Sequence, residues 1–129
     1  MEKIELKTNH NVRIVTLTTG ERVLCLFGEV RSDEDNIIGY RILYPFALTL
    51  GTPNDDGTIP ISYERWCPFS PQEEHRMSGE HIISVVFPDN NILDNYASRL
   101  KESAGLTDEQ IFLPEVTDGD NSEPAETSE

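Results

Sequence analysis

Five runs of alternating hydrophobic and polar residues occupy the first ninety positions of the chain, and clusters of turn-forming residues separate them. Alternation of this kind predicts strands with two different faces, and several runs this short predict a small antiparallel β structure. The last run, Ile-Ile-Ser-Val-Val-Phe from Ile82, is nearly continuous in its apolar character, which suits a strand buried on both faces. We expect strands at 13–18, 22–31, 37–50, 58–66 and 81–87.

Glycine and proline interrupt this series of strands. Gly28 predicts a bend or a bulge in the second strand. Pro45 predicts a break or an edge position in the third strand, because proline has no amide hydrogen to donate to a neighbouring strand. The prolines at 68 and 71 predict an irregular segment that continues to Gly79.

Short strands that bend in this way predict a mainly β fold, a small and strongly bent five-stranded antiparallel barrel with one C-terminal helix across an opening. A barrel of this size has exposed edge strands, and an edge as apolar as 81–87 is rarely left uncovered. Pairing with a neighbouring subunit is the usual remedy, so we expect a ring or another closed oligomer.

A helix is predicted after the last strand. Pro88 ends the strand, residues 89–91 offer N-cap side chains, and Gly105 predicts the C-terminal end of the helix. Residues 107–110 resemble a capping box, and the apolar residues 111–113 that follow are expected to dock on the fold. The apolar residues that recur at helical spacing are Ile92, Leu93, Tyr96, Ala97, Leu100 and Ala104.

These features divide the chain into three parts. Residues 1–104 form the barrel and its helix, residues 105–114 form a short docking segment, and residues 115–129 form an acidic tail. The tail consists almost entirely of Asp, Glu, Gly, Ser, Pro and Thr, with too little apolar surface to offset the entropy of ordering. We therefore expect the tail to be disordered.

The net charge excludes one class of function. Ten Lys and Arg face twenty-four Asp and Glu, which gives a formal net charge of −14. A protein that binds nucleic-acid phosphates along its whole surface needs a basic field, and this chain has the opposite. Because the tail holds six of the acids and no base, residues 1–114 carry only −8, and a few local phosphate contacts remain compatible with the charge.

Membrane and secretory features are missing from the sequence. No apolar run approaches the length of a membrane span, and residues 1–7 lack the apolar core of a signal peptide. Cys25 and Cys67 are too few for the disulfide framework of a small secreted chain. We expect a cytoplasmic protein with two reduced core thiols, and one long-range disulfide is the alternative.

No pattern of catalytic or cofactor-binding residues stands out. The glycines stand singly and no Gly-x-Ser-x-Gly elbow occurs, so we predict neither an enzyme nor a cofactor. His75 and His81, with Glu73 and Glu74 nearby, leave a metal site open as the alternative to solvated loop side chains. Residues 33–36 resemble a calcium loop but lack its Gly and its closing Glu, which favours an acidic hairpin tip.

Aromatic residues cluster in the middle of the chain, at Tyr40, Tyr44, Phe46, Tyr63, Trp66 and Phe69. The simpler interpretation is that these rings fill the barrel and close its end. The alternative is a platform on which nucleobases stack, with Arg31, Arg41 or Arg65 in contact with phosphates or rings.

The order of these motifs resembles that of a known family. The spacing Val12-x-Ile-Val-x-Leu-x-x-Gly20-Glu-x-Val23, followed by a bent strand, resembles the first half of an Sm-like (LSm) domain. A compact Sm-like family of marine phages and environmental sequences is similar over roughly residues 12–104. The motifs shared with that family are Leu17-x-x-Gly20-Glu21-x-Val23, the acidic hairpin 32–36, Tyr44-Pro45-Phe46, Trp66-Cys67-Pro68-Phe69, Ile82–Phe87 and Asp94-x-Tyr96.

The resemblance implies a ring of identical subunits, located in the host cytoplasm if the chain is of phage origin. In such a ring the fourth strand of one subunit pairs with the fifth strand of the next. The interface residues that this implies here are Ile61, Tyr63, Ile83, Val85 and Phe87.

Sm proteins also bind single-stranded RNA, which makes RNA an expected partner. Their base-contacting loops carry Asp-x-hydrophobic-x-Asn after the second strand and Arg-Gly between the fourth and fifth strands. Here Arg31 stands where the Asp would fall, Asn36 matches the Asn, and Arg76 is separated from Gly79. The resemblance therefore implies RNA contacts from Asn36, Arg31 and Arg76, while the departures weaken the match at both loops.

Two functions follow from these observations. The first is a non-enzymatic Sm-like ring that binds single-stranded RNA or modulates RNA–protein assemblies. The alternative is a protein–protein scaffold that presents acidic tails to basic proteins and binds no nucleic acid. The fold resemblance favours the first function, and the net charge favours the second.

Overall fold

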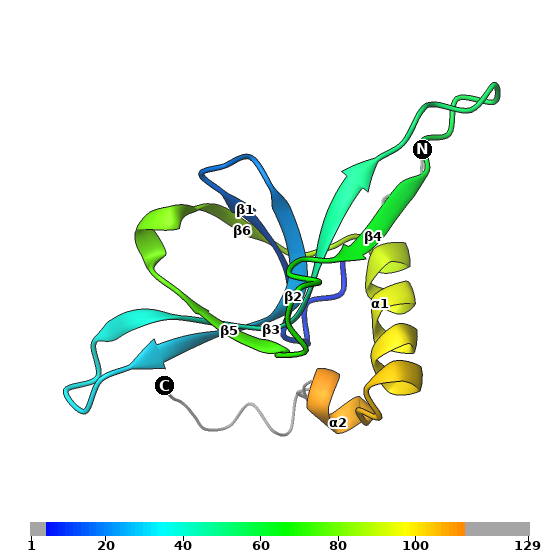
Figure 1. Ribbon diagram of the computed structural model, residues 1–129. Helices are drawn as coiled ribbons and strands as arrows, with labels where there is room; N and C mark the ends of the chain where they lie inside the picture. The colour runs from blue at the N-terminus through cyan, green and yellow to red at the C-terminus, as the bar shows by residue number, and fades with distance from the viewer. Residues whose placement is uncertain (1–4, 113–129) are drawn as a thin grey trace.

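The computed structural model describes residues 5–112, which form a mainly β fold with one long helix. Figure 1 shows the elements along the chain. The strands are β1 (Val12–Leu17), β2 (Arg22–Arg31), β3 (Ile37–Leu50), β4 (Ile61–Arg65), β5 (Glu74–Met77) and β6 (Ile82–Val86). The helices are the 3₁₀ helix η1 (Gly79–His81), α1 (Asn90–Ser103) and α2 (Asp108–Ile111).

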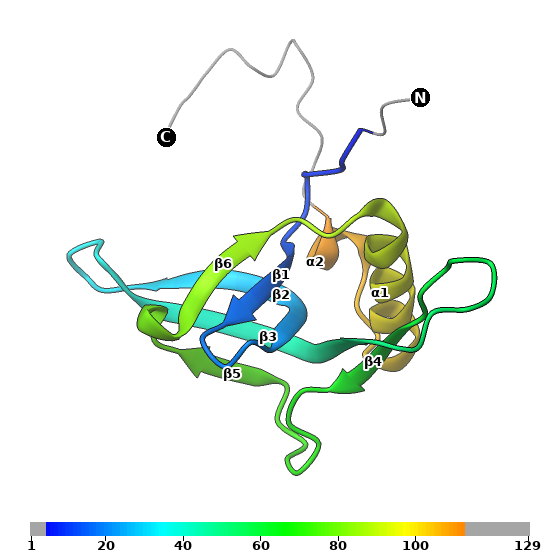
Figure 2. The ribbon, with the colours of Figure 1, turned by 90° about the horizontal axis from the view of Figure 1, so that it is seen from above.

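The six strands form one antiparallel sheet, which curls strongly in both overall views (Figures 1 and 2). Its strand order is β4-β3-β2-β1-β6, and β5 pairs with β3 beside β4. Within residues 5–112, β4 and β6 do not pair with each other, so the sheet is not closed. The predicted five-stranded barrel is therefore corrected to an open six-stranded sheet with a C-terminal helix.

Strand β5 lies inside the segment that the prolines led us to expect as irregular. Its four residues pair with β3 from Tyr40 to Leu43, whereas β4 pairs with β3 from Phe46 to Leu50. The 14-residue β3 thus has room for two short strands along one edge. The mixed sequence of β5, Glu-His-Arg-Met, has little alternation, so its strand conformation depends on the edge that β3 offers.

A β-bulge in β3 separates these two halves. The register advances by two residues in β2, from Leu24 to Leu26, and by three residues in β3. Tyr44 lies in the bulge with φ 52°, a left-handed conformation that is costly for a residue with a side chain. Pro45 lies in this bulge, within a continuous strand that has neighbours on both sides, so neither the break nor the edge position predicted there occurs. Gly28 pairs regularly with Arg41 and does not form the predicted bulge.

The sheet packs apolar side chains on both faces. One face, inside the curl, holds a cluster of Val15, Leu17, Val23, Cys25 and Ile42, with Phe27, Trp66, Met77 and Ile82 packed against it. The other face packs against α1 and α2, through a cluster of Val12, Leu24, Leu26, Leu93, Tyr96, Ala97, Leu100 and Ile111. The two views place α1 beside β4 (Figures 1 and 2).

Local signals for the helix are confirmed. The Asp89 side chain accepts a hydrogen bond from the Ile92 amide at 2.8 Å, and Gly105 follows the helix with φ 71°. The capping box from Thr107 to Gln110 begins the short helix α2, which places Ile111 in the core. No helix within residues 5–112 is long and apolar enough to cross a membrane.

Candidate functional site

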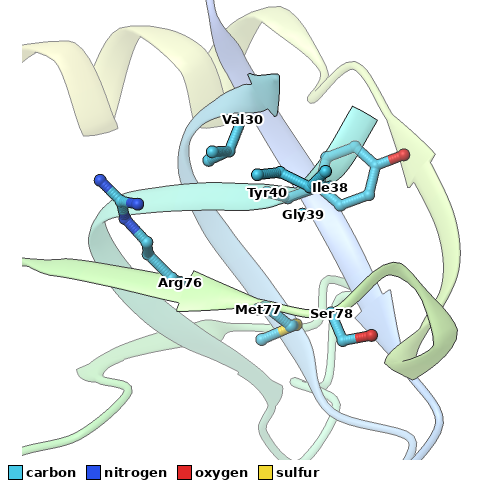
Figure 3. A pocket seen from close by; sticks show the side chains of 7 residues that line it. All are labelled: Val30, Ile38, Gly39, Tyr40, Arg76, Met77 and Ser78. Atoms are coloured by element: carbon cyan, nitrogen blue, oxygen red, sulfur yellow. The ribbon is translucent and has the colours of Figure 1, made fainter. Parts of the chain in front are cut away.

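A shallow pocket of about 300 Å³ lies where β2, β3 and β5 meet (Figure 3), in the part of the sheet from which the β2–β3 hairpin projects (Figures 1 and 2). Mostly apolar side chains line it, together with Ser78 and one arginine, Arg76. Arg76 and Tyr40 extend toward different sides of the sheet. The lining residues are Val30, Ile38, Gly39, Tyr40, Arg76, Met77 and Ser78. Of the three predicted RNA-contacting residues, Arg76 is the one that lines this pocket.

The side chain of Arg76, a predicted RNA contact, is largely exposed to solvent. It lies in β5 directly opposite Arg41 of β3, and its side chain is 68% exposed. The Oε2 atom of Glu74 lies 3.7 Å from its Nε atom, so the charge is partly compensated in a solvated setting. Arg76 can therefore still offer most of its guanidinium hydrogens to a ligand.

Arg31 is engaged within its own hairpin. Its guanidinium contacts Glu29 at 2.7 Å and Asp35 at 3.4 Å, and these carboxylates raise the pKa of Arg31. Glu29 makes the larger contribution, because it accepts hydrogen bonds from two guanidinium nitrogens. An arginine compensated by two carboxylates is a weak candidate for phosphate binding.

Asn36 closes the turn of the same hairpin. Its amide donates to Ser32 Oγ at 3.3 Å, and its carbonyl accepts from the Ser32 amide at 2.8 Å. Neither Asn36 nor Arg31 lines the pocket beside Arg76. The structure thus places two of the three predicted RNA contacts together in the hairpin and the third on β5.

The predicted interface residues lie at the two ends of the sheet. Ile61 and Tyr63 belong to β4, and Ile83 and Val85 belong to β6. Ile83 and Val85 are 63% and 39% exposed, so the expected burial of this strand on both faces does not occur within the described chain. Phe87 instead packs within its own chain, where the Arg13 guanidinium lies 3.9 Å from the centre of its ring and His10 contacts it edge-on.

The histidines have separate environments. His75 meets the edge of the Trp66 ring, His81 lies near Glu80, and His10 is fully buried. Within residues 5–112, no three His, Cys, Asp or Glu side chains gather in a way that could hold a metal ion. Glu73 pairs with Arg65 and Glu74 with Arg76, so these two carboxylates contact arginines.

Most of the aromatic rings pack within the fold, as the simpler interpretation predicted. Tyr44, Phe46 and Tyr63 pack on the cluster under α1, and Trp66 packs on the cluster inside the curl. Phe27 and Tyr40 stack on each other at 5.2 Å, whereas Phe69 is 96% exposed. A platform of several exposed rings is therefore absent from residues 5–112.

The register of β5 on β3 creates a feature that sequence reasoning missed. It brings Arg41 and Arg76 to directly opposed positions, and Gly28 of β2 completes the same row. In the sequence, Arg41 is only one of several arginines near the aromatic residues. Because β5 was not predicted as a strand, no sequence signal could place the two arginines side by side.

Comparison of the sequence with protein-family models and with curated proteins finds no match. The resemblance to Sm-like domains therefore stays a prediction based on the motifs of this chain.

Proposed function

We propose that the chain is a non-enzymatic, Sm-like subunit that assembles with identical copies into a closed ring, with β4 of one copy paired to β6 of the next. The observation that carries this proposal is the exposure of apolar side chains along a sheet edge, at Ile83, Val85 and Val86 of β6. An exposed apolar edge strand has unpaired backbone groups and readily pairs with another chain.

The two free edges support a ring better than a two-fold dimer. Strands β4 and β6 form opposite ends of the sheet order, and β4 also carries the exposed Ile61. Pairing of two different surfaces is heterologous, and heterologous contacts close into rings when the rotation between neighbours allows it.

A matched pair of substitutions tests this assembly. Ile83 in β6 and Ile38 in the β2–β3 hairpin are 63% and 64% exposed, so Lys at either position changes charge and hydrophobicity equally. Sedimentation of the wild type should give a discrete multiple of 14.6 kDa, and Ile83→Lys should shift it to the monomer. Ile38→Lys should leave the oligomer intact. A wild-type monomer at micromolar concentration would overturn the ring.

We further propose that the ring binds single-stranded RNA. The support is local: the exposed Arg76 beside a pocket formed by three strands, in a chain whose overall charge forbids broad phosphate contact. Fluorescence anisotropy with labelled oligo-U and oligo-A across a salt series tests it, and we expect binding that weakens as salt rises. Lack of binding at low salt, where electrostatic attraction is least screened, would contradict this part of the proposal.

The charge of the chain supports a second candidate, a scaffold that binds basic proteins. Six acids and no base lie in residues 115–129, which are outside the described residues. A full-length variant with these six acids changed to Asn or Gln should lose binding to a labelled oligolysine peptide that the wild type retains. Equal binding by both proteins would exclude the tail as the contact.

A further inference from the structure

Two arginines oppose each other across the junction of β3 and β5. Arg41 pairs directly with Arg76, and Gly28 of β2 is the third member of the same row. Directly opposed residues of an antiparallel pair point to one face, with their Cβ atoms about 4.5–5.5 Å apart. Like charges at such positions repel each other and destabilise the strand pair unless a carboxylate or a bound anion compensates them.

The compensation within the fold is incomplete. Within residues 5–112, Glu74 is the only carboxylate at ion-pair distance from either guanidinium, and it contacts Arg76 alone. Arg41 is exposed and has no ion pair with any described residue. The pair therefore retains about one net positive charge at its position in an acidic chain.

Other arginines of the sheet show that this arrangement is not general. Arg31 contacts two carboxylates, and Arg65 contacts Glu73 at 3.4 Å. The guanidinium of Arg13 lies over the ring of Phe87. Arg22 is exposed and has no ion pair with any described residue, but it lies opposite Thr16 and Leu48 and not opposite another arginine. The Arg41–Arg76 pair thus concentrates exposed positive charge at one point, where an anionic group can bind two guanidinium forks.

Two hollows lie beside the pair, and each adjoins one of its arginines. The pocket of about 300 Å³ adjoins Arg76 and contains Gly39, and a second pocket of about 380 Å³ adjoins Arg41 and contains Gly28. The second pocket also has apolar walls, from Leu26, Leu43 and Leu106. Both volumes lie at the small end of the range for ligand pockets, about 300–1,000 Å³.

We propose that Arg41 and Arg76 bind one phosphodiester of single-stranded RNA, with the flanking nucleotides resting in the two hollows. This inference rests on the proposed function and deepens it by naming the contact residues. Single-stranded RNA alternates anionic phosphates with flat bases, and this alternation matches two arginines with a hollow on each side. Guanidinium groups bind phosphate through paired hydrogen bonds and also stack on bases. An acidic peptide offers the anion but not the flat groups.

The site has a quantitative signature, because it engages few phosphates. For single strands, the slope of log binding constant against log salt is about −0.7 for each phosphate neutralised. A short probe such as tetrauridylate should therefore give a slope close to −0.7 on the wild-type protein. A broad electrostatic surface would give a much steeper slope.

Charge-removing variants of the full chain test the assignment. Anisotropy of fluorescein-labelled tetrauridylate at about 50 mM salt should show roughly tenfold weaker binding for Arg41→Gln and for Arg76→Gln. Arg22→Gln is the matched control, because Arg22 is exposed on β2, has no ion pair with any described residue and lies outside both hollows. It should change the affinity less than twofold.

A steric variant separates shape from charge. A Cβ atom added at Gly28 meets nothing within 4 Å, so Gly28→Val fits the strand and fills part of the hollow beside Arg41. It should weaken tetrauridylate binding while the net charge stays the same. Sedimentation of each variant, run in parallel, should give the wild-type oligomer.

The outcomes are distinguishable from those of the proposed function. Wild-type binding that is insensitive to Arg41→Gln, Arg76→Gln and Gly28→Val would overturn this site and leave RNA binding elsewhere on the ring. Equal losses for Arg22→Gln would overturn it in favour of general electrostatics. Tighter binding of a labelled hexaglutamate peptide than of RNA would overturn the nucleic-acid assignment. Lack of any RNA binding would overturn both this site and the proposed RNA binding of the ring. The ring assembly itself is tested separately, by sedimentation.

Discussion

The Nδ1 atom of His10 accepts a hydrogen bond from the Val12 amide at 3.1 Å, which holds the buried imidazole in one neutral form. The Nε2 atom, which carries the proton, donates to the Lys7 carbonyl at 2.9 Å. The rings of Phe87 and Phe112 meet the imidazole edge-on, so it joins both ends of the described chain to the residue that follows β6. A second proton would have to occupy Nδ1, where it would face an amide donor.

We predict that this arrangement makes stability depend on pH. Burial lowers the pKa of His10 from 6.5, and the charges of Arg13 and Lys7 act in the same direction. The unfolded chain therefore binds the proton first as pH falls, so the free energy of unfolding is highest above pH 6.5 and falls below it. The loss is at most about 1.4 kcal/mol per pH unit.

Urea unfolding between pH 7.5 and 5.5 measures this effect. The wild type and His81→Gln, which alters an exposed histidine, should lose stability alike, and His10→Gln should lose much less over the same range. His10→Gln should also be less stable at the higher pH, because it removes a satisfied, buried ring. An unchanged pH slope in His10→Gln would contradict the role given to this residue.

The hydroxyl of Tyr96 should stabilise the β-bulge in β3. It donates to the Tyr44 carbonyl at 2.7 Å from within the core under α1. Tyr96→Phe should lower the free energy of unfolding by about 1–3 kcal/mol, because the carbonyl of the left-handed residue Tyr44 loses its partner. Chemical denaturation measures the loss. Tyr63→Phe is the control, because the Tyr63 hydroxyl has no hydrogen bond within residues 5–112, and it should change stability little.

The two thiols should differ sharply in reactivity. Both cysteines are free, and burial raises the pKa of Cys25 to about 12, whereas Cys67 is only half-buried. Because the thiolate is the reactive form, a thiol reagent should modify Cys67 in the native protein and Cys25 only after unfolding. Cys67→Ser should abolish the native reaction and Cys25→Ser should preserve it. A native protein with two reactive thiols, or with none, would contradict this prediction.

Asp89 should contribute measurably to the stability of α1. Its side chain satisfies the Ile92 amide, and removal of such an N-cap costs about 0.5–2 kcal/mol. Asp89→Ala should therefore lower the urea midpoint. Asp94→Ala removes the same charge from the exposed side of the helix, where Asp94 makes only a 3.7 Å pair with Lys7, and should lower it less.

The sequence predicted best where the cause of a conformation is local. Asp89 and Gly105 set the ends of α1, because each acts through its own backbone or its nearest neighbours. Strand β5 and the open sheet were missed, because they depend on how far β4 extends along β3. That length is a property of the tertiary fold and leaves no local pattern.

The residues of the candidate site were likewise predicted only in part from the sequence. Arg31 was placed correctly in a strand next to the hairpin, yet the carboxylates of Glu29 and Asp35 pair with its guanidinium. Arg76 was selected from the family resemblance, and its partner Arg41 could be identified only from the register between β3 and β5. Composition and spacing do not predict which residues of a site lie opposite each other on strands that are far apart in the sequence.

The antiparallel bridge between His10 and Phe112 also determines how the molecule responds to mechanical force. The next rung, a bond from the Asn11 amide to the Ile111 carbonyl, lies farther from both ends of the chain. A pull applied at the two ends therefore opens the rungs one after another, as in unzipping, instead of loading them together in shear. The fold should yield at low force along this direction, and the His10 ring would be the first core group exposed to water.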